Sequence, residues 1–261
     1  MSVRAEEAAQ SLFLDHRHGR LLVPFARDWG AHDLAGAYEI QEALVRRLVP
    51  VHGTRVGYKI GLTSPRMQQM CSIPHPVAGV VLASRLQPSG TVRRVSELVH
   101  LGLEFEICVR MARDLPPRAE PWSLEEVAAA VGSVAPAFEV IDDRHSPYPL
   151  DALSLVADNA WNEGIVVGEF RERWPDDLRA VRGTVSCDDR EVDEGTGSAV
   201  LGHPFAPVVW LAAHLGARGE TLRAGEIVST GSLVTTRFPQ AGERYRFSVE
   251  GVGSVDLVLA P

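Results

Sequence analysis

The 261-residue sequence is poor in cysteine, with only three thiols and no pair at Cys-x-x-Cys spacing. Cys71, Cys108 and Cys187 lie far apart in the chain, and their number is odd. A disulfide framework needs paired cysteines, and a thiolate zinc site needs them closely spaced. The sequence therefore predicts three reduced, mostly structural thiols and neither kind of site.

Positive charge is also scarce. Acidic residues outnumber lysine and arginine by 34 to 26, which gives a formal net charge of −8. This balance offers no basic surface to a phosphate backbone, so we expect no nucleic-acid partner. The same average field repels a small anionic substrate, and such a substrate therefore needs a local positive centre, either a metal ion or a lysine.

Long hydrophobic runs are missing as well. No stretch approaches the roughly 18 uninterrupted apolar residues of a membrane span, and the longest candidate, 208–215, ends at Gly216. The segment 1–20 is rich in charge and lacks the apolar run of about 7 to 15 residues that marks a secretory signal. We therefore expect a cytoplasmic protein with no membrane partner.

The 45% hydrophobic content suits one large domain, alone or with a small N-terminal lobe. Apolar residues recur at helical spacing over Ala5–Asp15 and Leu34–Leu48, which predicts two helices joined by a loop that contains Pro24. From Gly53 onward, short apolar runs broken by glycine and proline are typical of a sheet-rich body. We expect the chain to divide at residue 52.

Three further elements are expected within that body. Ser123 and Glu126 show the spacing of a capping box, which predicts the start of a short helix. Another helix is expected over Pro207–His214, because proline suits the first helical turn. The C-terminal segment predicts a hairpin with its turn at Glu250–Gly253. Helices and strands do not alternate in a regular βαβ rhythm, so the predicted fold class is α+β.

Acidic and apolar residues alternate strictly in the segment 103–109. In a strand, this alternation places Glu104, Glu106 and Cys108 on one side and four apolar side chains on the other. The two glutamate Cα atoms then lie roughly 6.5 to 7 Å apart, at a rise of about 3.3 Å per residue, so both carboxylates can reach one hard cation. An antiparallel strand with one solvated face shows the same pattern, and by itself the pattern favours that interpretation.

A third carboxylate, Glu139, closes the apolar run 134–138. A carboxylate at the end of a buried strand is costly unless it is paired, hydrogen-bonded or bound to a metal. Three glutamates without histidine or thiolate suit Mg²⁺ or Mn²⁺ better than zinc or copper. The spacing does not by itself show that the two segments meet.

Six segments appear in an order that is far more specific than any single motif. They are VGYKIGLTSPRMQ (56–68), HLGLEFEICV (100–109), AFEVIDDR (137–144), ADNAWNEGIVVG (157–168), LGHPFAPVVWLAAHL (201–215) and AGEIVSTGSLV (224–234). Together they resemble the 2-keto-4-pentenoate hydratase and 4-oxalocrotonate decarboxylase branch of the fumarylacetoacetate hydrolase superfamily. The resemblance covers roughly residues 30 to 260.

This resemblance implies a mixed β-sheet roll with an N-terminal helical cap, here 1–52, and a metal-binding β-roll catalytic domain, here 53–261. It implies a bound Mg²⁺ or Mn²⁺ and a short unsaturated 2-oxo or 2-hydroxy acid as substrate. Two metal ligands come from the E-x-E strand and the third from a later strand, which places them on Glu104, Glu106 and Glu139. Asp142 and Asp143 are weaker candidates, as outer or surface groups.

Lys59 stands among apolar residues between Gly57 and Gly61, which let a ligand approach the backbone closely. From the residues alone, a lysine whose ammonium reaches solvent from a sheet edge is the favoured interpretation. The resemblance implies instead that Lys59 reaches the active site as a cationic or proton-transferring group. A desolvated lysine beside a metal can have a lowered pKa, which suits acid–base work.

Candidate substrate-binding residues have equally good structural explanations. Thr230 and Ser232, on either side of Gly231, can present hydroxyl and N–H groups to a carboxylate or simply form a strand-end turn. Asp158 and Asn159 can contact substrate or anchor a turn. The isolated histidines His145 and His203 receive no role.

Two positions depart from the pattern of the similar enzymes. Ser84 stands where those hydratases carry an aspartate, and Trp161 replaces a small hydroxyl residue. A serine cannot serve as a carboxylate base at neutral pH. If water addition needs a carboxylate at position 84, ketonisation or decarboxylation should therefore be easier to detect than water addition, and Trp161 should reshape the pocket. Ser84 is also a candidate substrate-binding residue.

The leading function is hydration of a 2-hydroxy-2,4-dienoate to a 4-hydroxy-2-oxo acid by a metal-dependent lyase. Decarboxylation of an oxalocrotonate-like diacid and tautomerisation of the dienol are rival reactions. A protein that binds a ligand or partner without catalysis is the alternative of another class. We also expect a homo-oligomer, or a complex with a related decarboxylase or hydratase subunit.

Overall fold

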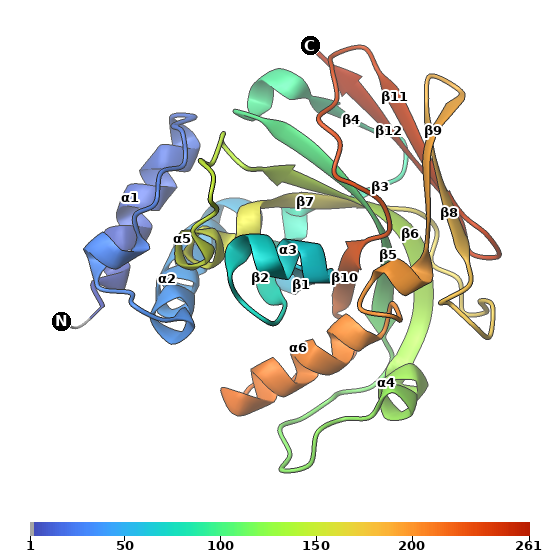
Figure 1. Cartoon of the computed structure of the whole chain (residues 1–261), viewed down its shortest axis with the longest axis horizontal. Coiled ribbons are helices and arrows are strands. Elements are labelled where there is room, and N and C mark those ends of the chain that lie inside the picture. The colour runs from blue at the N-terminus through green and yellow to red at the C-terminus, as the bar shows by residue number, and fades with distance from the viewer. Residues whose placement is uncertain (1–2) are drawn as a thin grey trace.

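The computed structural model describes residues 3–261 and contains two mixed β-sheets with helices around them (Figure 1). The larger sheet has the strand order β2-β1-β10-β5-β6-β7-β3, and the smaller has the order β4-β12-β11-β8-β9. The larger sheet consists of β1 (Arg55–Gly61), β2 (Val77–Leu82), β3 (Leu86–Pro88), β5 (Leu101–Met111), β6 (Val131–Asp142), β7 (Asn162–Val167) and β10 (Ile227–Ser232). The smaller consists of β4 (Thr91–Arg94), β8 (Arg182–Cys187), β9 (Arg190–Thr196), β11 (Arg244–Val249) and β12 (Gly253–Ala260). The α+β class is confirmed.

The main hydrophobic core is built on one face of the larger sheet. Phe105 on β5 and Phe138 on β6 are register partners, and their rings meet edge to face with centroids 5.5 Å apart. Phe247 on β11 of the smaller sheet meets Phe105 in the same manner at 5.8 Å. Because side chains alternate along a strand, this arrangement turns the even-numbered residues of β5 to the other face.

Six α-helices flank the sheets within the described residues. They are α1 (Ala5–Arg17), α2 (Leu34–His52), α3 (Pro65–Cys71), α4 (Leu124–Ala130), α5 (Ala152–Ala157) and α6 (Ala206–Ala217). Short 3₁₀ turns are η1 (Ala26–Trp29), η2 (Ala83–Arg85), η3 (Val95–Glu97), η4 (Asn159–Trp161) and η5 (Gly197–Ala199). Over residues 3–261, no helix has the length and apolar character that a membrane span requires.

Most sequence-based expectations for these elements are confirmed. Helices α1, α2, α4 and α6 lie where we expected them, and the capping box of Ser123 and Glu126 is present. The C-terminal hairpin β11–β12 turns between Val249 and Gly253. Helix α2 continues through Pro50, beyond its expected end. The sequence did not predict α3 and α5, because six or seven residues are too few to establish a helical period.

The N-terminal helices share a hydrophobic cluster with later parts of the chain. Leu12 of α1 and Leu44 of α2 belong to the same buried cluster as Val156 of α5 and Leu82 of β2 (Figure 1, where α1, α2 and α5 lie together). Residues of the expected cap, 1–52, and of the expected body, 53–261, thus share one hydrophobic cluster. The division of the chain into these two domains stays a prediction.

A buried ion network also attaches α1 to the body. His16 lies with Nε2 2.8 Å from Asp158 Oδ1 and Nδ1 3.4 Å from Glu163 Oε1. Burial alone would lower the pKa of His16, but the Asp158 and Glu163 carboxylates outweigh it and raise that pKa to about 9. Arg144 Nη2 contacts the other Asp158 oxygen at 2.6 Å, so Asp158 is paired on both sides.

His16 should therefore stabilise the fold in a pH-dependent manner. Its folded pKa lies above the ordinary value, so the contribution is complete below about pH 6.5 and is lost as pH rises through about 9. The shift corresponds to roughly 3 kcal/mol at about 1.36 kcal/mol per pH unit. We expect His16→Gln to lower the Tm strongly at about pH 6 and much less at about pH 10.

The exposed His32 provides the matched control, and His32→Gln should leave the Tm unchanged at both pH values. A Tm difference between wild type and His16→Gln that stays constant over this range would contradict the ion-network interpretation.

Candidate metal centre

The structure brings Glu104, Glu106 and Glu139 together on one face of the larger sheet. Glu104 on β5 and Glu139 on β6 are register partners, and Glu106 lies two residues further along β5. One ligand atom from each carboxylate lies within 4.8 Å of the other two. Glu106, Glu139 and Cys108 are fully buried. The shared face of Glu104 and Glu106 is confirmed, and the interpretation of that face as solvated is wrong.

Each carboxylate is held through one of its oxygens. Glu106 Oε2 accepts hydrogen bonds from Ser229 Oγ at 2.5 Å and from the Gly231 N–H at 2.9 Å. Glu104 Oε1 accepts one from Thr236 Oγ1 at 2.8 Å. These contacts fix the direction in which the remaining oxygens point.

Glu139 is held in the same way, by an amide and an ammonium group. Its Oε1 accepts a hydrogen bond from Asn162 Nδ2 at 3.1 Å and lies 3.0 Å from Lys59 Nζ. Two carboxylate oxygens, Glu139 Oε2 and Glu106 Oε1, are buried and have no hydrogen-bond partner among residues 3–261. A buried, unpartnered carboxylate oxygen is costly, and a hard cation with oxygen ligands removes that cost. The donor set therefore fits Mg²⁺ or Mn²⁺.

The electrostatics of the cluster support the same view. Burial, followed by the charges of Glu139 and Glu104, raises the pKa of Glu106 well above its ordinary value. Burial also raises the pKa of Glu139 to about 7, although Lys59 acts in the opposite direction. Three carboxylates this close repel one another when ionised, and a bound cation would relieve that repulsion.

Lys59 lies on β1 and is almost completely buried. Gly79 is its register partner on β2, and a Cβ there would come within 3.1 Å of the Lys59 stem. Burial alone would lower the pKa of Lys59, but Glu139, Glu104 and Glu106 outweigh it and raise the pKa. The lowered pKa was expected for Lys59 beside a bound metal, and it stays a prediction. The interpretation of Lys59 as a sheet-edge lysine that reaches solvent is wrong.

The segment 229–232 of β10 forms an irregularity opposite β5, where the register shifts between Ser229 and Ser232. Gly231 has a φ of +114°, and a Cβ there would come within 2.1 Å of Thr63 Oγ1, so glycine is required. Thr230 Oγ1 donates to the Ile107 carbonyl, and Ser232 Oγ accepts from the Phe105 N–H. These contacts favour a structural role, and substrate binding by Thr230 and Ser232 stays an untested prediction.

Two further candidate substrate-binding residues, Asp158 and Ser84, bond to groups other than the three clustered carboxylates. Asp158 is buried with both oxygens paired, to His16 and Arg144, which favours a structural role over the expected substrate contact. Ser84 is exposed on η2, and its Oγ lies 3.1 Å from His52 Nδ1 of α2. The placement of Ser84 does not support the substrate contact we expected.

The turn before β7 is left-handed at three consecutive residues, with positive φ at Asn159, Ala160 and Trp161. The Asn159 side chain bonds both the N–H and the carbonyl of Val80, which confirms its turn-anchoring role. Trp161 packs against the buried cluster that α1 and α2 share with the body. The replacement at Trp161 therefore supports the turn, and its expected effect on the pocket stays a prediction.

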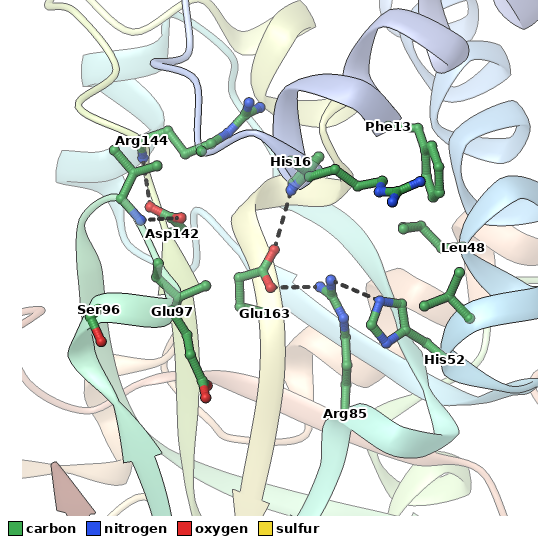
Figure 2. A pocket seen from close by; sticks show the side chains of 15 residues that line it. Phe13, His16, Leu48, His52, Arg85, Ser96, Glu97, Asp142, Arg144 and Glu163 are labelled. Carbon is green, nitrogen blue, oxygen red and sulfur yellow. Dashed lines mark hydrogen bonds and ion pairs between the residues drawn. The ribbon is translucent and has the colours of Figure 1, made fainter. Parts of the chain in front are cut away.

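A separate cavity of about 850 Å³ lies between the N-terminal helices and β7 (Figure 2). Glu163 points into it and pairs with His16 of α1 and with Arg85 Nη1 at 3.1 Å. The preceding residue, Asn162, bonds Glu139 instead. None of the three clustered carboxylates lines this cavity. One strand thus separates the candidate metal centre from the ion network.

Sequence reasoning missed the groups that hold the carboxylates. Ser229, Asn162 and Thr236 come from segments between 23 and 132 residues away from the glutamates they bond. Asn162 alone had a local signal, as a polar residue two positions before the run 164–167.

Comparisons with known proteins place this geometry in context. The profile described as Fumarylacetoacetate (FAA) hydrolase C-terminal matches residues 67–259. The 2-keto-4-pentenoate hydratase of Burkholderia vietnamiensis (strain G4) is 32% identical over 257 residues, which cover 98% of this chain and 94% of that relative. The 4-oxalocrotonate decarboxylase of Pseudomonas putida is 33% identical over 229 residues, which cover 87% and 86%. These similarities span most or nearly all of the chain.

The solved structures include a similarly extensive match. The 4-oxalocrotonate decarboxylase from Pseudomonas putida G7, complexed with magnesium and adipate, superposes with a TM-score of 0.91. Its sequence is 29% identical, and the superposition covers 98% of this chain and 97% of that one. The arrangement of both sheets and the N-terminal helices is thus shared with a metal-containing protein.

The first test of the centre is Glu106→Gln. The amide keeps the shape of the side chain and still accepts from Ser229 and Gly231, but it carries no negative charge. Loss of a residue that only supports a metal ligand usually lowers metal affinity about 10- to 100-fold. Glu106 is a candidate ligand itself, so we expect calorimetry to show a larger fall in Mn²⁺ affinity. Without metal, the variant should be at least as stable as wild type, because one of three like charges is gone.

The exposed Glu172 supplies the control, and Glu172→Gln should bind Mn²⁺ as wild type does. Unchanged Mn²⁺ affinity in Glu106→Gln would remove Glu106 from the ligand set.

Proposed function

Because this chain belongs to the fumarylacetoacetate hydrolase family, we propose that it is a divalent-metal-dependent lyase that hydrates a 2-hydroxy-2,4-dienoate to a 4-hydroxy-2-oxo acid. The observation that carries the proposal is the buried carboxylate cluster beside Lys59, with two carboxylate oxygens left unpartnered. The names of relatives at about 30% identity, hydratases and a decarboxylase, support this class of substrate.

Glu104, Glu106 and Glu139 would hold Mg²⁺ or Mn²⁺. Bound there, the ion would stabilise negative charge on the carboxylate and the 2-oxygen of the substrate. The chain contributes the orientation of the ligands, since Ser229 and Gly231 hold Glu106 while Asn162 holds Glu139. The magnesium bound in the structural relative supports this assignment.

Lys59 is suited to carry the proton. Its Nζ lies 3.0 Å from Glu139 Oε1, and both groups are buried, so a proton can be held between them away from bulk water. Ketonisation of the dienol adds a proton at C5 and removes the 2-hydroxyl proton, which yields a conjugated ketone that water attacks at C4. Proton transfer by a positioned group typically contributes about 10²- to 10⁴-fold to the rate.

Decarboxylation of an oxalocrotonate-like diacid is the second candidate. The structural similarity to a decarboxylase complexed with adipate, itself a six-carbon diacid, favours it. The expectation that Ser84, in place of a carboxylate, weakens water addition stays a prediction, and Ser84 itself lies exposed beside His52. Tautomerisation and a role as a non-catalytic binding subunit are the remaining alternatives.

The proposed partner is a small anionic 2-oxo or 2-hydroxy acid, and the proposed location is the cytoplasm. A homo-oligomer, or a complex with a related decarboxylase or hydratase subunit, is also proposed. The names of the relatives suggest catabolic enzymes, which supports the small-molecule substrate.

An isotope experiment tests the reaction. The purified protein with Mg²⁺ or Mn²⁺ is given 2-hydroxypenta-2,4-dienoate in H₂¹⁸O, and we expect a 4-hydroxy-2-oxo product labelled at C4 after label at the 2-oxo group is washed out. Glu106→Gln should give no such product. Carbon dioxide release from the diacid without C4 labelling of the monoacid product would reassign the protein as a decarboxylase. Metal binding without either reaction would favour the non-catalytic alternative.

Lys59→Met separates catalysis from metal binding. Methionine retains much of the apolar stem but removes the titratable proton, so kcat should fall by roughly 10² or more. Mn²⁺ affinity should stay the same or rise, because the variant removes a positive charge from beside the carboxylates. Near-normal kcat would exclude Lys59 from proton transfer, and a large loss of Mn²⁺ affinity would make its role structural.

A further inference from the structure

A second group of metal-ligating side chains lies where β5 begins and β6 ends. His100 directly precedes β5, and Asp143 and His145 follow β6. Their ligand atoms lie within 4.8 Å of one another, and His100 Nδ1 is 2.8 Å from Asp143 Oδ1. We propose that His100, Asp143 and His145 form a second metal site, one that takes a transition metal such as Zn²⁺ or Cu²⁺.

The cluster is distinct from the carboxylate centre. In the β5–β6 register, Leu101 pairs with Asp142, whereas Glu104 pairs with Glu139. Three residues at about 3.3 Å each place the two pairs roughly 10 Å apart along the hairpin. One metal ion cannot contact both groups, because ligand bonds are only about 2.0 to 2.6 Å long.

The donor chemistry also differs between the two sites. Two imidazoles and one carboxylate suit Zn²⁺, Cu²⁺ or Ni²⁺, whereas Mg²⁺ prefers oxygen ligands alone. The separation of His100 Nδ1 and Asp143 Oδ1 is 2.8 Å. Two ligands that each lie about 2.1 Å from a metal are roughly 3.0 Å apart at right angles, as in a square-planar copper site, and roughly 3.4 Å apart in a tetrahedral zinc site. A metal ion that lies beside the line between these two atoms can therefore displace the proton that they share, after a small adjustment of the side chains.

The backbone holds the two segments in place through a single carboxylate. Asp142 accepts hydrogen bonds from the N–H groups of Val99 and His100 before β5 and of Arg144 after β6. Arg144 and His145 have φ values of +44° and +54°, an unusual left-handed pair without glycine. This turn brings the His145 ring onto the His100 ring, with centroids 4.1 Å apart.

His100 is held in place, and the site is open to solvent. The His100 ring stacks on Phe238 as well as on His145, at 4.1 Å and an interplanar angle of 7°. His100 and Asp143 are partly buried, while His145 is exposed and its ring can turn to direct a nitrogen lone pair at the metal. An ion can thus enter from solvent without any rearrangement of the sheet.

Copper electron paramagnetic resonance tests the site independently of any reaction. One equivalent of Cu²⁺ is added to wild type and to Glu106→Gln, each with excess Mg²⁺. We expect nitrogen superhyperfine splitting from imidazole in both proteins, since the carboxylate centre has only oxygen ligands. His145→Gln and His100→Gln should each lose this signal, and the exposed His32→Gln should retain it.

Zn²⁺ calorimetry in excess Mg²⁺ gives a second measurement. We expect one equivalent to bind, and the affinity to fall by more than about tenfold in His145→Gln, because a lost ligand costs at least as much as a lost outer contact. His145 is exposed, so this variant should fold normally. Nitrogen splitting that survives in both cluster variants, or Zn²⁺ binding unchanged in both, would overturn the proposal.

Discussion

The buried charges on one face of the larger sheet impose the strictest requirement on this fold. Glu106, Glu139 and Lys59 are all removed from water, and the partly buried Glu104 adds a third negative charge beside them. Taking an ionised group out of water costs several kcal/mol unless it is paired or hydrogen-bonded. One lysine cannot balance three ionised carboxylates, so the cluster must either bind another cation or take up protons. The two unpartnered oxygens are the candidate ligands for such a cation.

Glycines and an irregular stretch of backbone in the surrounding strands make room for these buried charges and supply a hydrogen bond to them. Gly79 leaves room for the Lys59 stem, and Gly231 lets the backbone of β10 turn its N–H toward Glu106. The opposite face of the same strands is packed with aromatic and aliphatic side chains, including Phe105 and Phe138. That core fixes the register of β5 and β6, and this register places Glu104 beside Glu139. Rigid positioning of the carboxylates thus comes from the apolar face behind them.

Local sequence patterns predicted the features that depend on a single segment, such as which side chains share a strand face. They did not predict contacts between segments that are distant in the sequence. Strict alternation over 103–109 was enough to place Glu104 and Glu106 on one face. The partners Ser229 and Thr236 depend on the pairing of β5 with a strand and loop more than 120 residues away, which no local pattern reports. The ion pair of Asp158 was missed for the same reason, because its partner His16 belongs to the first helix. Family resemblance supplied the third carboxylate, which spacing left open.

Strand β7 contributes adjacent residues to two separate groups, the candidate metal centre and the ion network around His16. Its first residue, Asn162, orients the candidate metal ligand Glu139, and the next, Glu163, pairs with His16 and Arg85 on the other side. Consecutive side chains of a strand face opposite sides. The register shift between β6 and β7 at Val140 and Ile141 pairs Asn162 with Ile141, and so places Asn162 on the face of Glu139. Attachment of the N-terminal helices and orientation of Glu139 thus depend on two adjacent residues of one strand, Glu163 and Asn162.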